Sequence, residues 1–122
     1  MNYLLVGIGG FLGAVSRYAV SGWVHRWLNN PWFPYGTLTV NILGCFLIGI
    51  LGGMAESRHL FSPEIRLLTM VGFLGGFTTF SSFGYESLGL LRDGQFAGML
   101  WNLGLHIVLG LFAVWLGLNL TR

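Results

Sequence analysis

The densest group of polar side chains lies between Gly72 and Glu86, inside an apolar stretch long enough to cross a membrane. Four glycines occur there with five hydroxyl-bearing residues, namely Thr78, Thr79, Ser81, Ser82 and Tyr85. Irregular backbone at membrane depth survives only inside protein or beside water. The cluster therefore predicts a helix break near residues 75–79, whose freed carbonyls could bind a cation and whose amides and hydroxyls could meet an anion. The alternative is a helix-packing face with the hydroxyls bonded back to the preceding turn, although packing alone does not require so dense a polar run.

Phe80 and Phe83 are three residues apart and so share one helical face, flanked by Ser81 and Ser82. Aromatic edges carry partial positive charge, so rings turned edge-on into a pore could stabilise an anion without holding it tightly. Core packing is the commoner role of a phenylalanine pair in a membrane helix.

Arg17 and Glu86 are the only residues of formal charge well within the predicted spans. Each costs roughly 2.5 to 3.5 kcal/mol to insert, so such residues are functional candidates by default. The alternatives are that Arg17 snorkels or caps a neighbouring helix, and that Glu86 meets a hydroxyl or stays protonated.

Three further polar residues lie inside apolar segments: Asn41, Asn102 and His106. The amides need partners, and helix-to-helix hydrogen bonding is their commoner fate. His106 lies one turn after Asn102, so this face is expected to look into protein or water. A lone histidine there is more often a satisfied core residue than a ligand or proton switch.

The composition indicates that these polar residues lie in a membrane protein. Of 122 residues, 54% are hydrophobic and 8% are charged, and the mean hydropathy is +0.72. A soluble domain carries about 25% charged residues. We therefore expect an all-α membrane protein, a single domain over residues 1–122, with four transmembrane helices of which the third is broken mid-membrane.

The expected spans are residues 3–23, 36–55, 63–91 and 96–118, and Ser62 with Pro63 marks the start of the third. At about 43 Å if fully helical, the third span is longer than a hydrocarbon core of about 30 Å requires.

Several function classes are excluded by the same composition. The single cysteine, Cys45, cannot form an intrachain disulfide or a cysteine-built metal site. The net charge of +2 is too small and scattered for a nucleic-acid footprint, so no nucleic acid is expected as a partner. No nucleophile with a base, metal cluster or phosphate loop is visible, so the protein is not expected to be an enzyme.

The loop arginines do not settle the orientation of the chain. Three of them (Arg58, Arg66 and Arg122) fall on one side of a four-span protein, and two (Arg26 and Arg92) fall on the other. One interpretation is a weak bias resolved by the insertion machinery. The other is insertion in both orientations, which allows an antiparallel homodimer with a twofold axis in the membrane plane.

Three segments of the chain, in order, resemble the Fluc-type (CrcB-like) fluoride channels of microbial membranes. They are Gly9-Gly10-Phe11-Leu12-Gly13-Ala14-Val15-Ser16-Arg17-Tyr18, Gly36-Thr37-Leu38-Thr39-Val40-Asn41-Ile42-Leu43-Gly44 and Gly75-Gly76-Phe77-Thr78-Thr79-Phe80-Ser81-Ser82-Phe83. With Asn102 and the span spacing, the resemblance covers essentially the whole chain. It implies a dual-topology antiparallel homodimer in the cell (inner or plasma) membrane, with two pores that pass fluoride passively out of the cytoplasm.

The resemblance also implies roles for individual residues. Phe80 and Phe83 would contact fluoride edge-on, Asn41 would reach into the pore, and Ser81 and Ser82 would continue the polar path. The remaining expected pore residues are Thr79, Arg17, Glu86 and His106. A structural sodium ion on the twofold axis would be bound by main-chain oxygens of Gly75 and Thr78 from each subunit.

Two residues depart from the family pattern. Ser82 stands where many members carry threonine, which keeps the hydroxyl. His106 stands where a smaller polar residue such as serine or asparagine is expected, which changes the polar track there.

Two other functions remain as alternatives. A small proton-coupled exporter of organic cations, also an antiparallel four-span dimer, needs an essential membrane carboxylate, usually early in the first span. Here the first span has Arg17 and no acid, so Glu86 is the only candidate. A non-transporting assembly subunit would use polar residues only for helix contacts and leaves the run from Thr78 to Ser82 unexplained.

Overall fold

Every regular element that the structure describes is helical. The computed structural model describes residues 1–58 and 61–122 and has no strand within these ranges. The elements are α1 (Asn2–Trp27), α2 (Tyr35–Arg58), α3 (Pro63–Arg66), the π-helix η1 (Leu67–Phe73), α4 (Leu74–Phe77), α5 (Phe80–Arg92) and α6 (Phe96–Thr121). The helices from α3 to α5 follow one another along one segment.

Four helical segments are long and apolar enough to cross a membrane. They are Asn2–Trp27, Tyr35–Ser57, Pro63–Arg92 and Phe96–Thr121. This confirms the prediction of an all-α, multi-pass membrane protein. The helices extend beyond the predicted spans, since hydrogen-bonded turns continue into the polar residues that follow each apolar stretch. The polar cluster expected to end the second span at residues 56–59 is helical to Arg58, and His59 lies outside the described residues.

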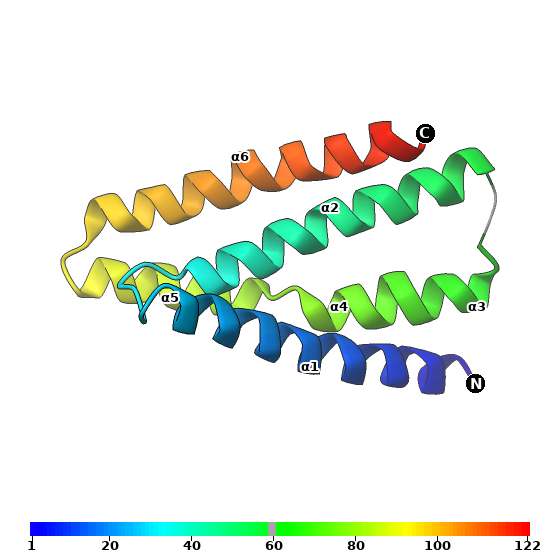
Figure 1. The fold of residues 1–122 in the computed structure, drawn as a ribbon, viewed down its shortest axis with the longest axis horizontal. Coiled ribbons are helices and arrows are strands. Elements are labelled where there is room, and N and C mark those ends of the chain that lie inside the picture. Colours follow the sequence, from blue (N-terminus) through cyan, green and yellow to red (C-terminus); the bar gives the residue numbers. More distant parts are fainter. Residues whose placement is uncertain (59–60) are drawn as a thin grey trace.

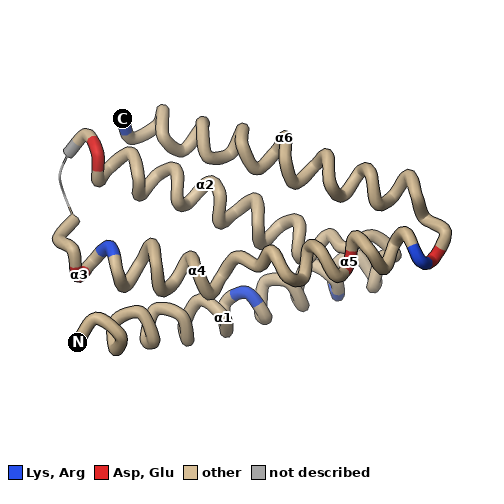
Figure 2. Tube along the Cα trace, turned by 180° about the vertical axis from the view of Figure 1, so that it is seen from behind, with Lys and Arg blue, Asp and Glu red and all other residues tan. Residues whose placement is uncertain are grey.

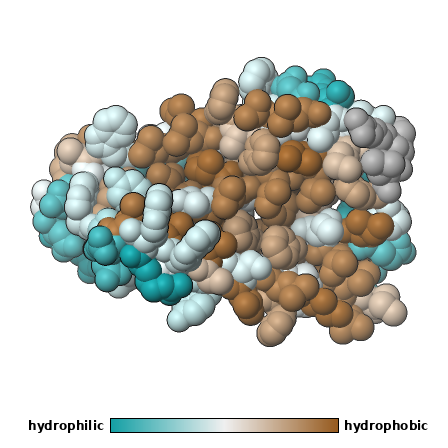
Figure 3. All heavy atoms as spheres, in the orientation of Figure 1, coloured by the Kyte–Doolittle hydropathy of each residue, from teal (hydrophilic) through white to brown (hydrophobic). Residues whose placement is uncertain are grey.

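The four segments run alternately up and down, with both chain termini at the same end (Figure 1). α6 packs along α2, and α1 packs along η1 and α4. Most charged residues lie near the two ends of the bundle, whereas one basic position on α1 and one acidic position on α5 lie further in (Figure 2). Hydrophobic residues cover the middle of the face seen in Figure 3, and hydrophilic residues gather toward its ends.

Glycines allow the closest approaches between these helices. A Cβ added at Gly13 would lie 2.9 Å from the Phe77 nitrogen, and one added at Gly117 would lie 2.7 Å from the nitrogen of Ile50. Real Cβ atoms do not come so close to backbone, so α1 and α6 pack against their neighbours only because these positions lack side chains. The glycine pairs Gly9/Gly13 and Gly49/Gly53 lie in these contacts.

The third segment departs twice from α-helical geometry. It begins as the sequence predicts, since the Ser62 hydroxyl accepts a hydrogen bond from the Ile65 N–H at 3.3 Å with Pro63 in the first turn. The π-helix η1 follows, a rare geometry that often occurs near functional sites. Thr78 (φ −88°, ψ 157°) and Thr79 (φ −150°, ψ 109°) then have extended backbone and separate α4 from α5.

Candidate functional site

The two extended residues are joined to α2 by the side chain of Asn41. The Asn41 Oδ1 accepts a hydrogen bond from the Thr79 N–H at 2.9 Å, and the Asn41 Nδ2 donates to the Thr79 carbonyl at 3.1 Å. One carboxamide therefore pairs with both backbone groups of Thr79. The Thr79 N–H has no helical partner, whereas the Thr79 carbonyl, as the N-cap carbonyl of α5, also accepts the first hydrogen bond of that helix. Because an unpaired backbone group in an apolar environment costs several kcal/mol, this pair stabilises the interruption.

The carbonyls at the end of α4 have different partners. Arg17 on α1 donates from Nε to the Gly76 carbonyl at 3.0 Å, and the Thr78 hydroxyl donates to the Leu74 carbonyl at 2.9 Å. The carbonyls of Gly75 and Thr78 receive no side-chain donor from residues 1–58 or 61–122. A Cβ added at Gly75 would meet nothing within 4 Å, so this part of α4 is open on the surface of the single chain.

Thr79 also begins α5 as its N-cap. Its Oγ1 accepts a hydrogen bond from the Ser82 N–H at 3.1 Å and lies 3.0 Å from the Ser82 Oγ and 3.3 Å from the Ser81 Oγ. The cap satisfies one of the amides that the first turn of any helix leaves without a partner. Three hydroxyls are thereby gathered at the start of α5.

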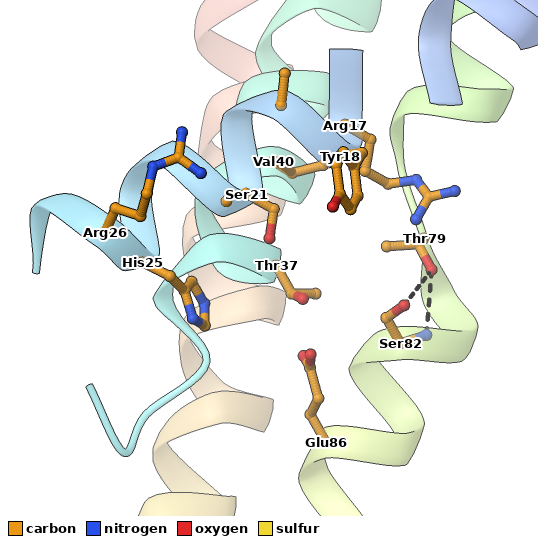
Figure 4. A pocket seen from close by; sticks show the side chains of 12 residues that line it. Arg17, Tyr18, Ser21, His25, Arg26, Thr37, Val40, Thr79, Ser82 and Glu86 are labelled. Atoms are coloured by element: carbon orange, nitrogen blue, oxygen red, sulfur yellow. Dashed lines mark hydrogen bonds between the residues drawn. The ribbon is translucent and has the colours of Figure 1, made fainter. Parts of the chain in front are cut away.

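A cavity of about 580 Å³ lies between α1, α2 and the start of α5. Figure 4 shows its polar lining: Arg17, Tyr18, Ser21, His25 and Arg26 come from α1, Thr37 from α2, and Thr79, Ser82 and Glu86 from the interruption and α5. In this view Glu86 points toward Thr37. The Glu86 Oε1 is buried and has no hydrogen-bond partner among the described residues. We call this space the arginine cavity.

A second cavity, of about 460 Å³, is lined by residues of α2, of the segment from η1 to α5 and of α6. Its lining includes Asn41, Thr79, Phe80, Phe83 and His106, and we call it the aromatic cavity. The Phe80 and Phe83 ring centroids are 5.5 Å apart, and the His106 ring lies 4.2 Å from that of Phe83 at an interplanar angle of 44°. Thr79 lines both cavities.

The structure brings the predicted site residues together in these two groups. Arg17, Thr79, Ser82 and Glu86 line the arginine cavity. Asn41, Gly75, Thr78, Thr79, Phe80, Phe83 and His106 line the aromatic cavity. Ser81 is exposed and lines neither of the two, although its hydroxyl lies near that of Thr79. The roles assigned to these residues stay predictions.

Asn102 on α6 is completely buried rather than part of a cavity lining. Its Nδ2 donates to the Ser87 hydroxyl at 2.9 Å, and its Oδ1 has no partner among the described residues. This contact is the helix-to-helix hydrogen bond that the sequence analysis treats as the commoner fate of such an amide.

Sequence reasoning missed several residues of the arginine cavity. Ser21 and His25 follow Arg17 at intervals of four residues, so the three share one face of α1. That spacing could have identified them. Thr37 lies one turn before Asn41 on α2 and is only 6% exposed. It stands inside the segment that resembles the fluoride channels but was given no role.

Comparison with known proteins shows similarity along almost the whole chain. Residues 4–118 match the family model described as CrcB-like protein, Camphor Resistance (CrcB). The chain is 49% identical to a fluoride-specific ion channel FluC of Chlorobium phaeobacteroides, over 98% of this chain and 91% of that one. It is 47% identical to the fluoride-specific ion channel FluC 1 of Methanosarcina acetivorans (93% and 86% covered) and 39% identical to a FluC of Geobacter metallireducens (100% and 98% covered).

The cap at Thr79 predicts unequal effects of two substitutions. Thr79→Val keeps the size of the side chain but removes the oxygen that accepts from the Ser82 N–H, so it should lower the free energy of unfolding by about 1 kcal/mol. Thr79→Ser keeps that oxygen and should stay within about 0.5 kcal/mol of the parent. Reversible unfolding of the purified proteins in mixed micelles measures both values. Equal stability of the two variants would contradict the cap.

Proposed function

Because this chain belongs to the CrcB family of fluoride channels, we propose that it is a fluoride-selective ion channel rather than an enzyme. It lets fluoride leave the cytoplasm down its electrochemical gradient and so lowers the toxicity of the ion. The relatives reported above carry the name fluoride-specific ion channel. The observation that carries the proposal for this chain is the grouping of Thr79, Phe80 and Phe83 at a helix interruption that opens on two cavities.

The chemistry of this grouping suits fluoride. The ion holds its hydration shell tightly, so a selective pore must replace water with several weak donors and stay too narrow for larger anions. Hydroxyls and aromatic edges are donors of that kind. The Arg17 guanidinium, which would hold an anion more strongly, already donates to the Gly76 carbonyl and lines only the arginine cavity.

We infer that the ion passes between the two cavities beside Thr79, since this residue lines both. The interruption falls in the middle of the segment Pro63–Arg92, which supports a break at mid-membrane depth. Ser81 and Ser82 supply further hydroxyls at the start of α5, and Glu86 lies along the arginine cavity.

The functional unit in this proposal is an antiparallel homodimer in the inner or plasma membrane. Phe80 is 82% exposed in the single chain, and Ser81 and Gly75 are exposed beside it. Hydroxyls and open backbone carbonyls are unfavourable against lipid, so a second copy covering this surface lowers their cost. The nearly even distribution of loop arginines, three against two, supports insertion of the two copies in opposite orientations.

A structural sodium ion fits the same surface. Sodium prefers oxygen ligands, and the Gly75 and Thr78 carbonyls have no side-chain donor within the described part of the chain. Both residues also line the aromatic cavity. In the dimer these carbonyls from each copy would bind the ion and hold the two interruptions together.

Efflux from liposomes tests the proposed function. Purified protein should release fluoride from potassium-fluoride-loaded vesicles when valinomycin is added, and should release no chloride from matched vesicles. Failure to release fluoride would contradict the proposal. Transport of organic cations driven by a proton gradient would instead support the exporter and identify Glu86 as its carboxylate.

Substitution of either phenylalanine separates conduction from packing. Phe80→Ile or Phe83→Ile keeps most of the hydrophobic volume but removes the aromatic edge, so the protein should fold while fluoride efflux falls at least about tenfold. Phe112→Ile on α6, an exposed aromatic outside both cavities, is the control and should conduct like the parent. If the Phe80 and Phe83 variants elute as the parent does and conduct at its rate, the pore lies elsewhere.

Insertion in both orientations predicts that a residue in the loop between α5 and α6 can be labelled from either side of the membrane. A single cysteine introduced at Asp93 in a Cys45→Ser background should react with a membrane-impermeant maleimide in intact spheroplasts to about half of its extent in permeabilised ones. Complete labelling in intact spheroplasts, or no labelling at all, would mean that the protein inserts in one orientation and would contradict the antiparallel dimer.

If a second copy and a sodium ion cover the surface around Gly75, a larger side chain at this position should impair assembly or conduction. Gly75→Val should disrupt the dimer or abolish efflux, because the added side chain meets the other copy. Gly7→Val is the control, since a Cβ there also meets nothing within 4 Å. Thr78→Ala should conduct, because the proposed ligand is its carbonyl. Parent-like elution and efflux of Gly75→Val would contradict the interface.

A further inference from the structure

His106 on α6 makes hydrogen bonds through both ring nitrogens. Its Nδ1 lies 3.0 Å from the main-chain carbonyl oxygen of Asn102, one turn earlier on the same helix. Its Nε2 lies 3.1 Å from the Nδ2 of Asn41 on α2. The ring thus connects α6 with the side chain that pairs with Thr79.

The partners fix which nitrogen carries the proton. A carbonyl oxygen can only accept, so Nδ1 must be the protonated nitrogen. The Thr79 N–H can only donate, so the atom facing it is the Asn41 Oδ1 and the Asn41 Nδ2 faces His106. Because an amide NH₂ only donates, Nε2 must present its lone pair. The ring is therefore neutral with the proton on Nδ1, since a doubly protonated ring would set one N–H against another.

This arrangement uses both hydrogens of the Asn41 amide. One is donated to the Thr79 carbonyl and the other to His106 Nε2. Asn41 consequently has no free N–H to offer an anion in the aromatic cavity. The phenylalanine edges that line this cavity remain available there, whereas the Thr79 hydroxyl already donates to the Ser82 Oγ.

We propose that His106 is a positioning residue for the ion path: as a hydrogen-bond acceptor it holds the Asn41 amide on Thr79 and keeps the amide hydrogens away from the ion. The proposal rests on the proposed function for its effect on fluoride, and it changes the expected role of His106 from a pore residue to one that acts through Asn41. The His106 ring centroid lies 4.2 Å from that of Phe83, with the rings tilted by 44°, so His106 also limits the positions that this aromatic can adopt.

The tautomer can be measured without any flux. The ¹⁵N spectrum of histidine-labelled protein in lipid nanodiscs at neutral pH should contain one residue with a protonated Nδ1 and an unprotonated Nε2. The signals of His106 are those missing from the spectrum of His106→Gln. A protonated Nε2 on His106 would overturn the proposal.

Two amide substitutions then test the acceptor itself. The terminal amide of glutamine occupies the position of Nε2, whereas that of asparagine occupies the position of Nδ1. His106→Gln should therefore accept from Asn41 and conduct fluoride at close to the parent rate. The shorter asparagine side chain of His106→Asn cannot reach Asn41. Loss of this one hydrogen bond should lower the population of the Asn41 amide that is paired with Thr79, and fluoride efflux should therefore fall about fivefold. Elution and thermal unfolding of both variants control for folding.

The outcomes separate this inference from the proposed function. Equal efflux of the two variants, whether at the parent rate or reduced, would overturn the positioning role while leaving the channel intact. If the parent protein releases no fluoride, the proposed function fails, and the ¹⁵N spectrum still decides whether His106 accepts from Asn41.

Discussion

The pairing of the Asn41 carboxamide with both backbone groups of Thr79 is the interaction on which the rest of the site depends. An apolar helical bundle can interrupt a helix only where the freed N–H and C=O groups find partners. Asn41 supplies an acceptor at 2.9 Å and a donor at 3.1 Å from a helix 38 residues earlier in the chain. With its backbone satisfied in this way, Thr79 can keep an extended conformation.

The extended conformation of Thr79 determines where the side chains of the candidate site lie. Its hydroxyl caps α5 and gathers Ser81 and Ser82 around it. Since α5 begins immediately afterwards, Phe80 and Phe83 fall on the aromatic cavity. The neighbouring carbonyls of α4 are held differently, with Gly76 bound to Arg17 and Gly75 left on the surface. One interruption thus accounts for both the aromatic cavity lining and the exposed position of Gly75, on which the proposed ion path and sodium site depend.

Much of the architecture could be predicted from local patterns. Apolar length predicted the four segments, and Ser62 followed by Pro63 predicted the start of the third. The density of glycine and hydroxyl residues predicted irregular backbone at residues 75–79, and within that range only Thr78 and Thr79 are extended, whereas residues 75–77 are helical. The ends of these segments and the irregular backbone are determined by residues close together in the chain, so the sequence alone is enough to predict them.

Other features depend on contacts between distant residues and could not be predicted. Nothing in the spacing of Asn41 and His106 indicates that they meet, because their approach follows from the packing of α2 on α6. The π-helix η1 lies against Gly9 of α1 and has no composition signal of its own. The resemblance implies that Asn41 reaches into the pore, a role that stays a prediction, but it does not indicate the hydrogen bonds that the Asn41 amide makes to Thr79 and His106.

The central claim is that Asn41 holds the Thr79 peptide, and exchange of the Thr79 amide hydrogen tests it most directly. In lipid nanodiscs, NMR of the parent protein should show a Thr79 amide protected from deuterium exchange. Asn41→Val removes the acceptor and should raise the exchange rate at least about fivefold, as expected for the loss of a buried hydrogen bond. An unchanged Thr79 exchange rate in Asn41→Val, with the fold intact, would contradict the account.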